Sequence, residues 1–218
     1  MSIASGPKDT KLSRSSSRRS PKELKYYLVD RNYRLSRSLG LTLENEELIR
    51  RRGIVSFTRL SGHPGFWEMP EPPCLRCIPE KGRMPRDLNY YCGFWLVSDR
   101  AKSVLESVDP AAFDFVKGKI IFPDDPPSSH YWFCDVLPII DALDETESDA
   151  RIEYERGGRK VYSLMGARRL IFKSERIGSA HIFRMAYIEP EIVCDEAFRI
   201  ACKTAGLKGF SFEAAIRG

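Results

Sequence analysis

Three carboxylates lie in an otherwise apolar stretch, "YWFCDVLPIIDALD", at residues 131–144. They are Asp135, Asp141 and Asp144. Carboxylates in such surroundings can act as catalytic acids, bind a metal ion or cap a helix. A catalytic pair needs two carboxylates that face one pocket, but Asp135 and Asp141 are six residues apart, about 600° along a helix. They would point in different directions, so we expect structural roles.

The aliphatic residues of the same stretch predict a helix. One helical face would be formed by Val136, Ile139, Ile140 and Leu143, widened by Leu137. Asp135 precedes this pattern, where its side chain can accept a hydrogen bond from a first-turn amide. Pro138 suits the first turn, where a missing N–H breaks no intrahelical bond. Asp141 and Asp144 would then lie on the solvated edge of this helix.

A zinc site is the second chemical possibility, because "PCLRC" places Cys74 and Cys77 in a C-x2-C spacing. Cys92 and His63 could complete four ligands. A strong prediction would require a second C-x2-C or an H-x3-H, and the sequence has neither. We therefore expect no metal and no cofactor. The six cysteines are better explained as reduced thiols, most of them in apolar segments.

Enzyme motifs are missing from the sequence. The three histidines, at 63, 130 and 181, are too few and too scattered to suggest a nucleophilic triad. His181 begins an apolar segment and is expected to be a partnered residue of a sheet. No G-x-S-x-G, P-loop or G-x-G-x-x-G occurs. The sequence therefore predicts no catalytic residues and a protein that is not an enzyme.

Composition is that of an ordinary globular protein, with 218 residues, 42% hydrophobic and 30% charged. No apolar run has the roughly 18 residues that a membrane-spanning helix needs. The first thirty residues have no apolar segment of the kind found in secretory signals, so we expect a cytoplasmic protein.

The net charge of +5 is concentrated in residues 1–22. Of the 35 basic and 30 acidic residues, this Ser/Arg-rich segment contains six and one, which leaves 29 of each in the remainder. Such a polar segment is expected to be disordered. It is either a solvated extension or a basic arm that binds nucleic acid or acidic surfaces, which would make the protein a nucleic-acid-associated or regulatory binding module. The neutral remainder does not suggest a nucleic-acid-binding domain.

The remaining residues, 23–218, predict a single α+β domain with a largely antiparallel sheet and a few short helices. Strands are expected at 24–30, 94–97, 168–173, 180–188 and 208–216, and helices at 43–51, 98–109 and 195–206. Hairpins are expected at 113–122, about Lys117-Gly118, and at 151–164, about Gly157-Gly158. The Pro/Gly-rich residues 61–93 are expected to be irregular.

Four segments in order resemble one known family. They are "GFWLVSDRAKSVLESVD", "YWFCDVLPIIDALD", "RLIFKSERIGSAHIFRM" and "VCDEAFRIACKTAGLKGFSF". The sequence is similar over about residues 84–213 to the bacterial immunity-protein family of polymorphic toxin systems, typified by a myxobacterial member. "KYYLVD" matches the opening strand of that family. The basic tail and "PCLRC" depart from its pattern.

The resemblance implies a partner of a cognate protein toxin used in interbacterial competition, such as a type VI secretion effector. It implies inhibition by binding and supplies no catalytic residues. Protein interfaces are anchored by aromatic and arginine side chains. Such side chains in the irregular segment are Phe66, Trp67, Arg83, Arg86, Tyr90 and Tyr91, which we take as candidate toxin contacts. The alternative is that these rings pack the segment onto the core.

Overall fold

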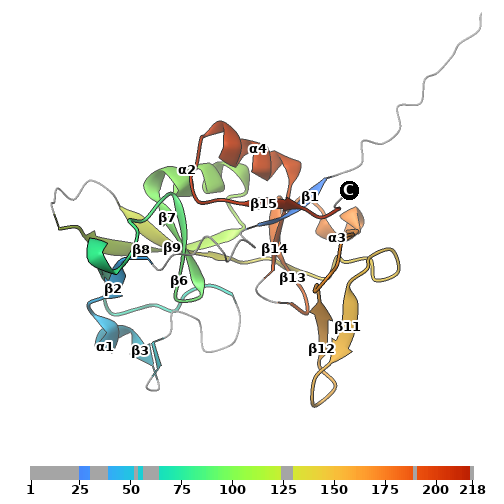
Figure 1. The fold of residues 1–218 in the computed structure, drawn as a ribbon, viewed down its shortest axis with the longest axis horizontal. Coiled ribbons are helices and arrows are strands. Elements are labelled where there is room, and N and C mark those ends of the chain that lie inside the picture. Colours follow the sequence, from blue (N-terminus) through green and yellow to red (C-terminus); the bar gives the residue numbers. More distant parts are fainter. Residues whose placement is uncertain are drawn as a thin grey trace, which may run out of the picture.

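The computed structural model describes residues 25–29, 39–51, 54–55, 64–123, 130–188 and 191–216. Within them, two sheets and two longer helices surround a common core (Figure 1). The pairings between the described strands are antiparallel except for two parallel ones, which confirms the predicted α+β class. The predicted tail lies outside the described residues.

One sheet has six strands in the order β2-β5-β8-β9-β7-β6. These strands are β2 (Leu41–Leu43), β5 (Cys74–Cys77), β6 (Leu88–Tyr91), β7 (Phe94–Ser98), β8 (Phe113–Ile121) and β9 (Tyr131–Val136). β5 and β6 lie within the segment that was predicted to be irregular. That prediction was wrong because pairing with β2 and β8 holds β5 in the sheet despite the prolines on either side.

The other sheet has five strands in the order β10-β13-β14-β1-β15. They are β1 (Tyr26–Val29), β10 (Ile139–Ile140), β13 (Ile182–Met185), β14 (Ile192–Asp195) and β15 (Phe212–Ala214). Two small ladders complete the strands: β3 (Arg50–Arg51) with β4 (Ile54–Val55), and β11 (Arg151–Tyr154) with β12 (Lys160–Ser163). The second of these is the predicted hairpin about Gly157-Gly158.

Two longer helices, α2 (Asp99–Val108) and α4 (Glu196–Thr204), lie side by side above the sheets (Figure 1). Both begin as predicted: the Ser98 hydroxyl accepts a hydrogen bond from Ala101 N–H, and the Asp195 carboxylate accepts one from Phe198 N–H. α4 is followed by Gly206, whose φ of 64° fits the predicted C-terminal cap. Two single-turn helices, α1 (Glu46–Ile49) and α3 (Ser174–Ile177), complete the set.

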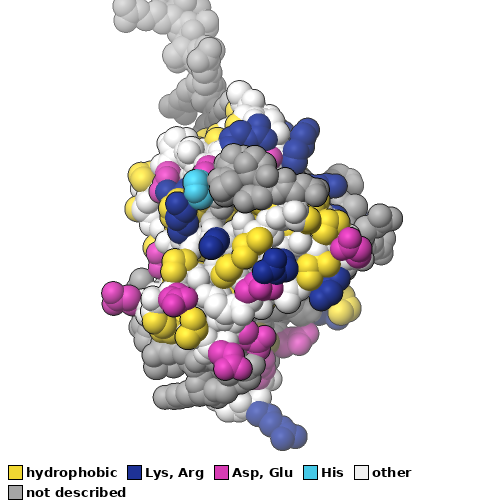
Figure 2. Space-filling view, turned by 90° about the vertical axis from the view of Figure 1, so that its left-hand side faces the viewer, with side chains coloured by type: hydrophobic (Ala, Val, Ile, Leu, Met, Phe, Trp, Pro, Cys, Tyr) yellow, Lys and Arg dark blue, Asp and Glu magenta, His cyan; other side chains and the backbone are white. Residues whose placement is uncertain are grey.

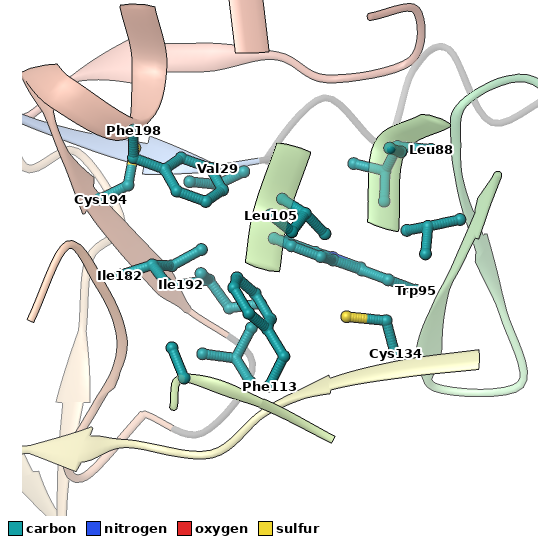
Figure 3. Close-up of a cluster of buried hydrophobic side chains, with 14 of the residues drawn as sticks. Val29, Leu88, Trp95, Leu105, Phe113, Cys134, Ile182, Ile192, Cys194 and Phe198 are labelled. Carbon is teal, nitrogen blue, oxygen red and sulfur yellow. The ribbon is translucent and has the colours of Figure 1, made fainter. Parts of the chain in front are cut away.

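The central core is shared by both sheets and both helices (Figure 3). Trp95 and Phe113 come from the six-stranded sheet, Ile192 from the five-stranded sheet, and Leu105 and Phe198 from the helices. A second cluster fills the outer face of each sheet. Because one core joins all the larger elements, residues far apart in sequence hold fixed positions relative to one another.

The helix predicted after Asp135 is wrong. The chain is extended through residues 131–140, where β9 ends in one sheet and β10 begins in the other. Leu137 precedes a proline, which disfavours helical backbone there. Backbone bonds from Leu137 N–H to Ala112 and from Arg184 N–H to Pro138 anchor the crossing. Val136 and Leu143 are buried and Leu137 and Ile140 half-buried, whereas Ile139 is 48% exposed, so the helical spacing of these aliphatic residues does not correspond to one buried face.

Two further strand predictions also differ from the structure. Residues 113–121 form one continuous strand, not a hairpin, because β8 pairs with β9 along one edge and with β5 along the other. Residues 168–173 form isolated bridges with Ile216 and Leu143, and α3 separates this segment from β13. Tertiary pairing overrides local preference in both cases.

Candidate protein-binding surface

Two carboxylates hold the loop before β5 against the sheet. Asp114 and Asp135 are direct partners across β8 and β9. Gly65 N–H donates to Asp135 Oδ2 at 2.7 Å, and Phe66 N–H donates to Asp114 Oδ2 at 2.9 Å. Asp135, which is 4% exposed, also forms an ion pair with Arg184 of the other sheet. Through these bonds the two aspartates act as a clamp that holds the loop. Asp135 also links the two sheets and does not cap a helix.

The other two aspartates of this stretch lie on the surface or near it. Asp144 accepts hydrogen bonds from the backbone N–H groups of Thr146 and Glu147 at 3.0 and 3.2 Å. The hydrogen bond from Glu147 N–H, the largest influence, lowers the pKa of Asp144 below its ordinary value, and the bond from Thr146 N–H lowers it further. The carboxylate therefore organises the turn after residue 144, consistent with a structural role.

Two of the six candidate contacts belong to the core. Phe66 is 5% exposed and packs on Phe94 with ring centroids 4.9 Å apart. Tyr91 is half-buried and packs edge-on against Phe133. Burial raises the pKa of Tyr91 to about 12. The structure therefore favours the core alternative for these two rings.

A buried amide organises the segment that carries the next candidates. The Asn89 side chain is 2% exposed and accepts hydrogen bonds from Arg83 Nη1 and Arg86 N–H, both at 2.9 Å. Its Nδ2 donates to the carbonyls of Arg86 and Leu96. All of the polar atoms of Asn89 are thus used to hold residues 83–89 against the edge of the sheet.

Three side chains of this segment are exposed on a rigid support. Tyr90 is 55% exposed, Met84 is 44% exposed, and Arg86 is exposed as well. We call Met84, Arg86 and Tyr90 the β6 surface. Arg83 is half-buried beneath it, and Trp67 is half-buried in the loop held by the clamp. Tyrosine, arginine and methionine are enriched at protein interfaces.

The zinc candidates are separated by the strand geometry. Cys74 and Cys77 stand an odd number of positions apart on β5, so they project to opposite faces, with Cys77 buried and Cys74 half-buried. Cys92 is exposed in the turn between β6 and β7, and His63 lies outside the described residues. Among the described residues, no three His, Cys, Asp or Glu side chains gather closely enough to hold a metal ion. Every described cysteine is a free thiol.

The two described histidines pair with carboxylates at helix N-termini. His181 Nδ1 lies 2.7 Å from Asp195, the residue that caps α4, so His181 is a partnered residue as predicted. His130 Nδ1 lies 3.2 Å from Asp99, the first residue of α2. Both pairs join a strand to the start of a helix.

A second exposed surface was missed by sequence reasoning. All four residues of β11 are exposed, with Ile152 at 40% and Tyr154 at 70%. Ile152 and Tyr154 share one face of the hairpin with their cross-strand partners, Tyr162 and Lys160. Tyr187 packs edge-on against Tyr162, with ring centroids 5.5 Å apart. We call these five residues the hairpin surface. Tyr162 itself is 5% exposed and belongs to a core cluster, so only Ile152, Tyr154 and Tyr187 of this surface are well exposed. The sequence predicts the hairpin but not which of its residues the body covers.

Comparison with known families decides what kind of protein this is. The model of the Immunity protein family (Imm11) matches residues 18–216. The chain belongs to this family. The match includes both sheets, α2, α4, the β6 surface and the hairpin surface of this Imm11 chain. No curated protein matches it. Among the described residues, its longest helix has ten residues, so none reaches across a bilayer.

Proposed function

We propose that this chain protects the cell that makes it by binding a cognate bacterial toxin in the cytoplasm and blocking its action. The observation that carries the proposal is the match to an immunity-protein family over residues 18–216. Inhibition is stoichiometric and non-catalytic, and it needs no cofactor.

The β6 surface is the toxin contact that we propose from the candidate residues. Its tyrosine, arginine and methionine side chains are exposed, while Asn89 fixes the backbone that carries them. A preorganised backbone lowers the entropy that is lost on binding. Phe66 and Tyr91 are packed in the core, and Arg83 is half-buried beneath this surface. Trp67 is half-buried in the loop held by Asp114 and Asp135.

The test is co-expression with the toxin encoded beside this gene. We expect the cells to survive and a 1:1 complex to co-purify. Replacing Tyr90 by Ala, or Arg86 by Glu, should weaken the complex by about tenfold or more, the loss typical of interface anchors. Ile200→Ala is a matched control, because Ile200 is 49% exposed on α4, away from β6. The proposal is refuted if cells that co-express the toxin and the unmodified protein do not survive and no complex of the two co-purifies.

Nucleic-acid binding through the basic tail is the other possibility raised by the sequence. Nothing in the described residues favours it. On the face shown in Figure 2, described basic side chains are interspersed with acidic and hydrophobic ones. We therefore keep toxin binding as the proposed function.

A further inference from the structure

The outer edge of β11 has unpaired backbone groups. Glu155 N–H donates to the Arg159 carbonyl, and the register pairs Tyr154 with Lys160. In an antiparallel ladder, bonded and non-bonded pairs alternate. Glu153 therefore bonds inward to Val161, and the N–H and C=O groups of Ile152 and Tyr154 point outward.

The opposite edge of the hairpin confirms this alternation. Tyr162, the partner of Ile152, sends its N–H away from β11 to the Tyr187 carbonyl at 3.0 Å. The outer edge of β12 is therefore held by the body. Among the described residues, no backbone group pairs with the outward groups of Ile152 and Tyr154. In Figure 1, the hairpin projects from the body of the molecule.

The side chains beside this open edge form a platform of aromatic rings that a lysine and a carboxylate hold in place. Lys160 Nζ lies 4.5 Å from the ring centroid of Tyr187 and 5.1 Å from that of Tyr162, and Lys160 also forms an ion pair with Glu145. The Tyr162 hydroxyl donates to the same carboxylate at 2.5 Å. Tyr187 holds a φ of 64°, a costly backbone conformation for a large side chain. The exposed Ile152 and Tyr154 continue this platform to the free edge.

The charged residues of the four-residue strand β11 lie on one face of its edge and leave the other face free of charge. Proteins usually shield an exposed edge strand with charges, a proline, a bulge or a covering segment. Here Arg151 and Glu153 share the other face, opposite Ser163 and Val161. On the apolar face Ile152 and Tyr154 are exposed, while Tyr162 behind them is buried against the body. Their alternating signs would define the register of an incoming strand.

We propose that the open edge of β11 binds an extended strand of the cognate toxin by backbone pairing. This inference rests on the proposed function and adds a contact separate from the β6 surface. The toxin strand would bond to the outward groups of Ile152 and Tyr154 and cover their side chains with apolar residues. It would place an acidic residue opposite Arg151 and a basic one opposite Glu153.

A second copy of this chain fits the edge less well. If two copies paired in antiparallel fashion about Glu153, their two Glu153 carboxylates would lie opposite each other. If they paired about Tyr154, Glu153 of each copy would lie opposite Glu155 of the other. Like charges in direct opposition are destabilising. Pairing centred on Ile152 would place Arg151 opposite Glu153 without like-charge repulsion, so a dimer in this register is an outcome that the test below distinguishes.

Proline substitution tests backbone pairing directly. Tyr154→Pro removes an outward N–H and leaves the bonds between β11 and β12 in place, since proline is tolerated where the N–H faces solvent. Tyr154→Thr removes the ring but keeps the N–H. With the toxin encoded beside this gene, we expect Tyr154→Pro to weaken the complex about 30-fold or more and Tyr154→Thr clearly less. Circular dichroism melting checks that both variants fold.

Amide hydrogen exchange gives an independent measurement on the unmodified protein. The amides of Ile152 and Tyr154 should exchange fast in the free chain and at least about tenfold more slowly in the complex, because pairing protects them. Equal affinity of the proline variant together with unprotected amides would overturn the inference while leaving the proposed function intact. Failure of the unmodified chain to bind the toxin would refute both. A dimer that is lost in Tyr154→Pro would assign the edge to a second copy instead.

Discussion

At the scale of single residues, Asp135 joins three parts of the chain that are distant in sequence. Its carboxylate accepts a hydrogen bond from Gly65 N–H and pairs with Arg184, whose Nε donates to the Val136 carbonyl at 2.9 Å. The side chain therefore links a loop to both sheets. Removing one partner of a buried ion pair of this kind strongly lowers the free energy of unfolding.

We expect Asp135→Asn to lower the free energy of unfolding by about 3 kcal/mol, because it breaks the largely buried ion pair between Asp135 and Arg184. Urea denaturation measures the change. Glu147→Gln is the control, since its ion pair with Arg169 is more than half exposed and should contribute well under about 1 kcal/mol. An equal effect of the two substitutions would contradict the role given to Asp135.

A second prediction concerns acid stability and Glu196. Hydrogen bonding from Arg199, the largest influence, lowers the pKa of Glu196 to about 2. The unfolded chain therefore takes up a proton at this group at higher pH than the folded chain does. The stabilising pair is complete at neutral pH and is lost as the pH falls through about 4 toward 2.

Glu196→Gln should therefore lower the melting temperature at pH 7 and make it fall less steeply between pH 5 and pH 2. Melting curves across that range, followed by circular dichroism, test both expectations. Parallel pH profiles for the variant and the unmodified protein would show that this pair does not contribute.

At the scale of elements, the C-terminal segment closes the edge of β6. Leu88 N–H donates to the Lys208 carbonyl at 3.0 Å, and the Asp87 carboxylate accepts a bond from Lys208 N–H at 2.7 Å. Phe210 packs edge-on against Trp95. One end of β6 is thereby covered, while Tyr90 at its other end stays exposed. Gly209 permits this close approach.

Gly209→Ala should destabilise the protein by at least about 2 kcal/mol more than Gly206→Ala. Both glycines have positive φ, 101° and 64°, so both substitutions strain the backbone. A Cβ at Gly209 would lie 2.1 Å from the Leu88 carbonyl oxygen, whereas nothing lies within 4 Å of one at Gly206. Urea midpoints of the two variants test this; equal losses would mean that the segment can move away from β6.

At the scale of the whole molecule, the two sheets and two helices form one body around a shared core. The basic tail precedes this body in sequence and carries the entire net charge. Both proposed toxin contacts lie in the described part of the chain, so we expect toxin binding not to need the tail. Nucleic-acid binding would need it, because the remaining residues have equal numbers of basic and acidic side chains.

A chain that lacks residues 1–22 should protect cells from the toxin as well as the full chain does. Survival on co-expression and the dissociation constant of the complex are the measurements. Two results together would contradict this prediction. The full chain would bind a labelled DNA duplex at low salt only when it has the tail, and the shortened chain would no longer protect the cells. Such binding would weaken steeply with added salt.

The sequence alone determined the features that depend on neighbouring residues. Ser98 and Asp195 mark the starts of α2 and α4 because a cap bonds to an amide three residues away. Gly157-Gly158 marks a hairpin, since glycine accepts the positive φ of a tight turn. The ordered segments that resemble the immunity family extended this local information to the fold class and the kind of partner.

Only the tertiary structure decided the role of "YWFCDVLPIIDALD". Its aliphatic spacing fits a helix, but β9 and β10 pair with strands of two different sheets. Their partners lie up to 45 positions away in the sequence, since Ile139 pairs with Arg184. The same holds for both proposed contacts. Burial of Phe66 and exposure of Tyr90 and Tyr154 depend on what packs beside them, which a one-dimensional pattern does not contain.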